Sequence, residues 1–212
     1  MTQTPVGRRE RKKAATRQAI ADEALRLFLE RGYDEVSVRD IADAADVSTT
    51  TLFKHFTGKE ALVFDQDQEN EAQLIAAVRR RADGQGIVDA LREYALGAYL
   101  PTALHPQAAE FNDLVESTPA LRDYAERMWT RHTDSLSAAV ADELGVEQDD
   151  IACVALARFV LQIPSLIRGQ SDRRAAVERV FDVIAHGWRS PESPPPGREG
   201  SGSAPARSTT SA

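Results

Sequence analysis

The sequence predicts an all-α protein of about nine helices, on three observations. Apolar residues recur at helical spacing along almost the whole chain, and no stretch shows the alternation typical of a strand. Glycine, proline or a small polar residue stands at most segment ends, as expected where helices begin and stop. We expect an N-terminal three-helix domain over 1–58, a larger helical domain over 59–189, and a disordered tail over 190–212, where Pro, Gly, Ser, Thr and Ala dominate.

The first three helices are predicted over 11–31, 38–45 and 49–56. The first carries a single apolar stripe, made of Ile20, Ala24, Leu27 and Phe28. Gly32 follows it, where a left-handed residue is needed. Ser37 and Ser48 are good N-caps for the second and third helices. Asp46 lies in the turn between these two and tolerates a left-handed backbone better than most residues.

Six further helices are predicted over 59–82, 87–103, 106–116, 119–144, 151–168 and 173–188. Pro106 and Pro119 stand at helix starts, where proline is tolerated, and Gly145 closes the helix over 119–144. Pro164 removes a hydrogen bond and crowds the preceding turn, so we expect it to end or kink its helix.

Composition and motifs exclude several classes of function. With 42% apolar and 28% charged residues, the chain has the balance of a soluble globular protein. Its single cysteine, Cys153, excludes an intrachain disulfide, and four scattered histidines leave no zinc-type spacing, so we expect neither a metal site nor a cofactor. No nucleophile, phosphate-loop or dinucleotide motif indicates an enzyme. The start lacks an apolar signal core, and the apolar stretch over 151–163 is too short to cross a bilayer, so we expect a cytoplasmic protein with no membrane partner.

Charge is distributed unevenly along the chain. The net charge is -7, yet residues 1–20 hold six basic side chains and one acidic side chain, whereas residues 65–212 hold fifteen basic and twenty-three acidic ones. A basic end on an acidic body is expected if only that end meets phosphates, although a basic run can also be merely solvated.

Residues 36–59 have the pattern of a helix-turn-helix, two short helices joined by a tight turn. The apolar residues lie on one face of each helix: Ile41, Ala42 and Ala45 on the first, and Val47, Leu52 and Phe56 on the second. The other face of the second helix carries Thr49, Thr50, Lys54 and His55. Small polar residues at the start of a helix can enter the major groove, and threonine offers a hydroxyl for hydrogen bonding and a methyl for thymine. The pattern therefore predicts a DNA-reading helix.

Residues 14–64, about a quarter of the chain, resemble the TetR/AcrR family of transcriptional regulators. Order, spacing and helix phase all agree with the family pattern at Gly32, Ser37–Ala42, Ala45, Val47, Ser48, Thr51–Phe53, His55, Phe56 and Lys59–Leu62. Three positions depart from it. Asp46 replaces the usual glycine of the turn, Thr50 stands where a glycine is frequent, and Phe53 replaces a tyrosine whose hydroxyl commonly donates to a phosphate.

The resemblance implies a DNA-binding role for ten residues. Base-edge contacts are implied for Thr49, Thr50 and Lys54, and phosphate contacts for Ser37, Arg39, Thr51, His55 and Lys59. Ser48 and Phe53 complete the predicted set, although Phe53 without a hydroxyl could serve only for packing. Any one of these side chains could also be solvated surface.

In this family the C-terminal helices form a ligand pocket, and the last two pair with a second subunit. The sequence is compatible with that, because the helix over 151–168 is apolar almost all round and must be covered, by a partner or within one subunit. The predicted dimer contacts are Val154, Val177, Val180, Phe181, Ile184 and Trp188.

Arg158 and Gln162 share one face of that apolar helix. They could bind an anionic or carbonyl-bearing ligand; alternatively Arg158 pairs internally with Glu110, Asp113 or Glu116, or makes a polar dimer contact. The predicted ligand-binding set is Tyr99, Phe111, Trp129, Arg158 and Gln162. Its aromatic members could equally belong to the core, and His105 and His132 are expected at the surface or in the core.

The resemblance implies a one-component transcriptional regulator whose partners are double-stranded DNA, a second copy of itself and an unidentified small-molecule effector. The expected form is a repressor that the effector releases from a pseudo-palindromic operator; ligand-dependent activation or co-repression is the alternative. A rival hypothesis is an interaction protein with a vestigial helix-turn-helix, which a steep salt dependence of DNA binding would exclude.

Overall fold

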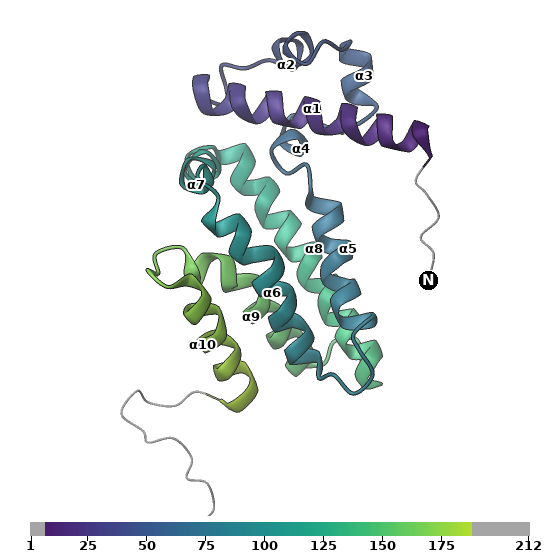
Figure 1. Cartoon of the computed structure of the whole chain (residues 1–212), viewed down its shortest axis with the longest axis vertical. Coiled ribbons are helices and arrows are strands. Elements are labelled where there is room, and N and C mark those ends of the chain that lie inside the picture. The colour runs from purple at the N-terminus through teal and green to yellow at the C-terminus, as the bar shows by residue number, and fades with distance from the viewer. Residues whose placement is uncertain (1–6, 188–212) are drawn as a thin grey trace, which may run out of the picture.

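The computed structural model describes residues 7–187, which form ten α-helices and no strand within that range (Figure 1). The all-α prediction is confirmed. Among these residues, no helix is both long and apolar enough to cross a bilayer. The tail predicted over 190–212, together with Trp188, lies outside the described residues.

The helices form a small N-terminal group and a larger bundle. The first group is α1 (Arg8–Arg31), α2 (Val38–Ala44), α3 (Thr49–Phe53) and α4 (Glu60–Val63). The bundle is α5 (Asp67–Arg79), α6 (Ile87–Leu104), α7 (Ala108–Ser117), α8 (Pro119–Leu144), α9 (Ile151–Ile167) and α10 (Arg173–His186). Figure 1 shows α2 and α3 on the side of α1 away from the bundle, with α4 between α1 and the bundle.

Local chemistry sets the boundaries of the first helices. Ser37 caps α2 in a capping box: its Oγ accepts from the Asp40 N–H at 3.1 Å, and its own N–H donates to Asp40 Oδ2 at 2.8 Å. Ser48 caps α3 by accepting from the Thr51 N–H at 3.1 Å. Asp46 has φ +52° in the turn between α2 and α3, and so takes the left-handed conformation expected of it.

The predicted helix over 59–82 is wrong in one respect, because it is two helices. The chain leaves α4 at Phe64 and resumes a helix at Asp67. Phe64 is held outside a helix by packing: its ring stacks on Tyr124 of α8, with centroids 5.2 Å apart, and meets Phe111 of α7 edge-on. Tertiary contacts thus override a helical pattern that the sequence carries without interruption.

Three other helix ends differ from the prediction. Helix α3 stops at Phe53, and a turn covers Lys54 and His55. Helix α7 begins at Ala108, two residues beyond the predicted proline start. Pro164 does not end α9, which continues to Ile167, so of the two predicted effects termination is excluded and a kink stays a prediction.

Two apolar clusters hold the helices together. The first joins α1–α4 to Leu114 of α7 and Leu121 of α8, so that the N-terminal group is seated on one end of the bundle. The second lies inside the bundle, between α5, α6, α8, α9 and α10. The position of α3 relative to the bundle is therefore set by the first cluster and by the α4–α5 junction.

Candidate nucleic-acid interface

Helix α3 turns its polar side to solvent and its apolar side to α1 and α2. Leu52 is 0% exposed and Phe56 is 2% exposed, and both belong to the first apolar cluster. The opposite side is open, with Ser48, Thr49, Thr50, Phe53 and Lys54 all exposed. The phase predicted from the sequence therefore leaves open a short polar ridge, made of Ser48, Thr49, Thr50 and Lys54, on a helix that lies on the side of α1 away from the bundle (Figure 1).

Several predicted phosphate ligands have structural tasks as well. The Ser48 and Thr51 hydroxyls lie 2.9 Å apart and hydrogen-bond to each other, which fixes the first turn of α3. The Ser37 hydroxyl donates to Asp40 Oδ2 at 2.5 Å. Arg39 is the freer group, since its side chain is 85% exposed and only a 4.0 Å approach to Asp43 restrains it.

Lys59 is engaged inside the protein. Its ammonium donates to the Tyr33 carbonyl and lies over the Tyr33 ring, 4.0 Å from the centroid. Burial lowers the pKa of Lys59, although Asp34 and Glu60 act in the opposite direction. The side chain therefore ties the start of α4 to the loop after α1, and its phosphate contact stays a prediction.

His55 lies half-buried where α3 meets α1. Burial lowers the pKa of His55, and the charges of Arg17 and Lys13 lower it further. The imidazole is therefore mainly neutral near pH 7. A neutral ring can donate one hydrogen bond to a phosphate but adds no charge to the contact.

Arg17 of α1 binds the two ends of this region together. Its guanidinium donates to the His55 carbonyl at the end of α3 and to the Asp65 carbonyl between α4 and α5, the second at 2.7 Å. It also lies over the Phe56 ring, 4.1 Å from the centroid. A cavity of about 80 Å³ adjoins it, lined in part by Tyr124. Sequence analysis counted Arg17 only as one charge of a basic run.

The basic run itself lies on α1. Arg8, Arg9, Lys12 and Lys13 are exposed on its first turns. Lys13 is close enough to His55 to shift its pKa, so this end of α1 runs beside the end of α3. The positive charge predicted from composition thus lies on α1, near the turn that follows α3.

The predicted dimer contacts divide into two groups. Val177 and Phe181 are 0% exposed within the second apolar cluster, so the chain itself covers them and they are not available to a partner, contrary to expectation. Val154, Val180 and Ile184 are half-buried. Large apolar side chains that the prediction did not include stand open on the same two helices: Ile151, Phe159, Leu166 and Val183.

The predicted ligand-binding residues are not brought together in this protomer. Tyr99 packs edge-on against Tyr94 beside the second cluster, whereas Phe111 packs against the first. Trp129 meets His132 edge-on with centroids 5.6 Å apart. Arg158 and Gln162 are exposed on α9. The sequence of α9 is apolar on almost every side, but one face of this helix is not covered by the rest of the chain.

A surface hollow of about 380 Å³ lies along α8, and none of these five predicted residues lines it. Its walls are Glu126, Arg127, Thr130, Arg131 and Asp134. Beside it, a polar cluster that sequence analysis did not find connects α5 to α8 through Asp67, Glu71 and His132. No spacing rule could reveal it, because Asp67 and His132 are 65 residues apart in the chain.

Helices α2 and α3, joined by the tight turn at Asp46 and seated on α1, form a helix-turn-helix with an exposed second helix. This unit on a helical body defines a DNA-binding transcriptional regulator. The family model "Bacterial regulatory proteins, tetR family" matches residues 20–65. The HTH-type transcriptional regulator TcmR of Streptomyces glaucescens is 31% identical over 154 residues, 68% of this chain and 67% of that protein. The chain belongs to the TetR/AcrR family of transcriptional regulators, which confirms the resemblance found in the sequence.

Two further comparisons cover more of the chain. The HTH-type transcriptional repressor AcnR of Corynebacterium diphtheriae is 26% identical over 186 residues, 82% of this chain and 92% of that protein. A putative TetR-family regulator from Syntrophomonas wolfei has the same fold, with a TM-score of 0.60 at 19% identity over 81% of this chain and 94% of that one.

Proposed function

We propose that the protein is a cytoplasmic one-component repressor that binds a pseudo-palindromic operator as a homodimer and is released by a small-molecule effector. The observation that carries the proposal is the exposed polar ridge of α3, held on a fully buried Leu52. A helix of this kind reads one half-site in the major groove, and two copies read both halves. The relative AcnR, named a repressor, supports the sign of regulation.

Each side chain of the interface has its own part in the proposal. Thr49, Thr50 and Lys54 contact base edges, because they are exposed at the outer side of α3. Arg39 and the basic turns of α1 contact phosphates and supply affinity without sequence preference. Ser37, Ser48, Thr51 and His55 hold the two helices in place and contribute uncharged hydrogen bonds to the backbone of the DNA.

The second subunit covers the open apolar face of α9 and α10. Ile151 is 79% exposed and Phe159 is 57% exposed, and with Leu166 and Val183 they leave several large apolar side chains open on these two helices, as expected of an interaction surface. Arg158 and Gln162 lie on the same helix and meet the partner as polar contacts, the alternative to a ligand-binding role that the sequence left open. Pairing through these helices places the two copies of α3 at a fixed separation.

The effector acts through the α4–α5 junction. A ligand in the bundle that prefers another arrangement of α5 shifts the dimer to that arrangement, and DNA affinity falls by the ratio of the ligand's affinities for the two states. Arg17 transmits the shift, because it holds both the end of α3 and the Asp65 carbonyl.

The test is fluorescence anisotropy with a labelled fragment from upstream of the protein's own gene. Thr50→Ala combined with Lys54→Ala should weaken specific binding by at least about tenfold, since one good base contact contributes about 1–3 kcal/mol. By contrast, a variant that loses a phosphate contact, such as Arg39→Ala, should lower the slope of log affinity against log salt by about one.

The matched control is Thr130→Ala combined with Arg127→Ala, which removes the same kinds of side chain from exposed positions on α8. It should leave binding unchanged. Unchanged binding by the α3 variant, or equal losses by the two variants, contradicts the proposed interface. Absence of any salt-sensitive binding by the wild-type protein contradicts the regulator itself.

A further inference from the structure

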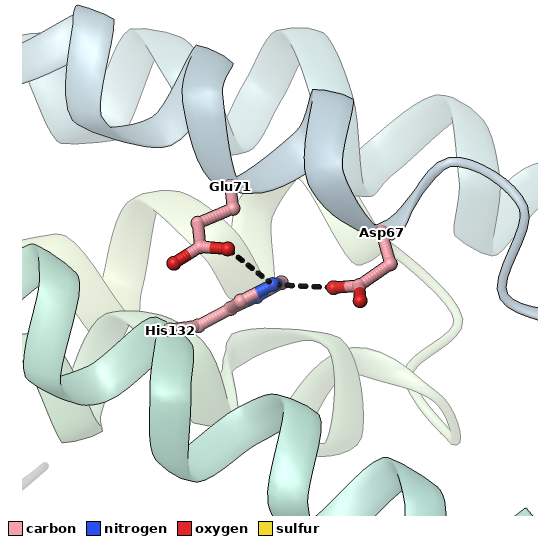
Figure 2. Close-up of side chains that lie close together, drawn as sticks. All are labelled: Asp67, Glu71 and His132. Carbon is pink, nitrogen blue, oxygen red and sulfur yellow. Dashed lines mark hydrogen bonds and ion pairs between the residues drawn. The ribbon is translucent and has the colours of Figure 1, made fainter. Parts of the chain in front are cut away.

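A buried polar cluster joins α5 to α8 below the α4–α5 junction (Figure 2). Asp67 and Glu71 lie one turn apart on the same side of α5, and His132 faces them from α8. His132 Nε2 is 2.7 Å from Asp67 Oδ1 and 3.9 Å from Glu71 Oε2. Asp67 is 8% exposed and His132 is 3% exposed, so the ring nitrogen is directed between two carboxylates and away from bulk water.

This set of donors is chemically suited to a divalent transition metal. One imidazole nitrogen and two carboxylate oxygens can be chosen so that all three lie within 4.8 Å of one another. Ligand atoms about 2.0–2.2 Å from a zinc ion are separated by about 3–4 Å, so only a small adjustment would centre an ion among them. The imidazole favours zinc, cobalt or nickel over magnesium or calcium, which prefer sites made of oxygen alone.

The surroundings orient both carboxylates as an outer shell of a metal site does. Ser135 Oγ donates to Glu71 Oε1 at 2.6 Å, and Arg131 Nη2 donates to Asp67 Oδ2 at 2.5 Å. Arg131 Nε also donates to Glu71 Oε2 at 3.2 Å. These bonds fix the side chains of Asp67 and Glu71 while leaving Asp67 Oδ1 directed at the imidazole.

The charge of the cluster favours a cation. Two carboxylates face one guanidinium, so a neutral imidazole leaves one negative charge uncompensated in a buried place. A divalent cation held between the two carboxylates would offset that charge.

We propose that Asp67, Glu71 and His132 bind one divalent transition-metal ion of the zinc class, which takes the place of the Asp67–His132 hydrogen bond. The fourth ligand is water, and Arg131 and Ser135 keep their bonds to the carboxylates. Because Asp67 is the first residue of α5, the ion fixes the start of that helix against α8. The site does not depend on DNA binding.

The experiment uses the full-length chain without a histidine tag, stripped with EDTA and titrated with ZnCl2 by calorimetry. We expect one equivalent to bind, and Co²⁺ in its place to give visible absorption bands that excess Zn²⁺ removes. His132→Gln and Asp67→Asn should each weaken Zn²⁺ binding at least about tenfold, since even outer-shell changes cost that much. Glu71→Gln is a milder variant that keeps an acceptor for Ser135 and should weaken binding in the same direction.

His105→Gln and Glu69→Gln are the matched controls, because both residues are exposed and outside the cluster. Circular dichroism checks that each variant is folded. If His132→Gln does not fold, the Zn²⁺ affinity of Glu71→Gln tests the site instead. The proposal is overturned if the wild-type chain binds less than one equivalent of Zn²⁺. It is also overturned if Glu71→Gln leaves the affinity for Zn²⁺ unchanged. Equal losses in the cluster variants and the two controls overturn it as well, because they place the ion elsewhere.

Discussion

Arg17→Ala is the substitution that most directly tests how the recognition helix is held. The change removes two hydrogen bonds from a charged donor to the carbonyls of His55 and Asp65, and the contact with the Phe56 ring. These groups belong to α1, the end of α3 and the α4–α5 junction. No other side chain supplies a donor to these two carbonyls among the contacts seen in residues 7–187.

The magnitude follows from the partners. A hydrogen bond from a charged donor contributes about 1.5–3 kcal/mol, and the half-exposed position of Arg17 favours the lower end of that range. A cation–π contact at a similar depth adds about 0.5–1 kcal/mol. These terms are not additive, so we expect Arg17→Ala to lower the free energy of unfolding by about 2–4 kcal/mol. The stability of Arg17→Lys should lie between those of the wild type and Arg17→Ala, because one ammonium group cannot bind both carbonyls as the forked guanidinium does.

The assay is urea unfolding at one fixed protein concentration, followed by anisotropy with the upstream DNA fragment. The control is Arg26→Ala on the same helix, which removes two solvent-accessible ion pairs, at 2.7 Å to half-exposed Glu23 and at 2.8 Å to exposed Glu30. Exposed pairs contribute little, so its unfolding midpoint should stay within the scatter of repeat titrations. Equal midpoint shifts for Arg17→Ala and Arg26→Ala would refute the reasoning, as would full DNA affinity in folded Arg17→Ala.

Three further predictions concern the helix ends around the recognition helix. Ser48→Ala leaves the Thr51 N–H without its acceptor and should cost about 1 kcal/mol of stability in urea unfolding, with a fall in DNA affinity; unchanged values in both assays contradict the role of the cap. Asp46→Val places a β-branched residue at φ +52° and should destabilise the protein by about 1–2 kcal/mol. Asp46→Gly should change stability by less than about 1 kcal/mol. A larger loss for Asp46→Gly than for Asp46→Val in urea unfolding would show that the turn is not left-handed in solution. Hydrogen bonds from the Ser37 side chain, and then from its backbone, lower the pKa of Asp40 in the folded protein. The stabilisation from the capping box is therefore complete above the ordinary carboxyl pKa of about 4, and it is lost as the pH falls through the lower pKa of the folded state. Asp40→Asn should therefore lose stability at neutral pH and show a flatter acid limb in urea titrations from about pH 6 to pH 3, and parallel limbs in the two proteins would contradict this.

The parts of the fold that the sequence predicted are those that depend on neighbours in the chain. Ser37 and Ser48 cap the helices they precede, and Gly145 closes α8 in the left-handed conformation. The break at Phe64 was missed because its cause is a ring of α8 that stacks on it. Periodicity reports which residues can lie on one face of a helix, and it does not report which tertiary contact interrupts the helix.

The same distinction applies to the candidate site. The exposed side of α3 was predictable, because the positions of Leu52 and Phe56 fix its phase. The role of Lys59 was not, because its acceptor is a backbone carbonyl 26 residues away. Periodicity also could not show that Val177 faces the bundle while Phe159 faces solvent, since both are apolar residues on apolar stripes. Only the packing of neighbouring helices separates a covered face from an open one.

The recognition helix cannot be stable by its own propensity. It has five residues, three of them threonine, whereas isolated helices shorter than about 12 residues are marginal even in favourable sequences. Its conformation and direction therefore come from the Ser48 cap, from the burial of Leu52, and from the hold of Arg17 on the carbonyl that follows. The Ser48 cap is local to α3, but Arg17 also binds the Asp65 carbonyl between α4 and α5. In the proposed mechanism, a movement of α5 would therefore reach α3 through Arg17 and leave the local cap in place.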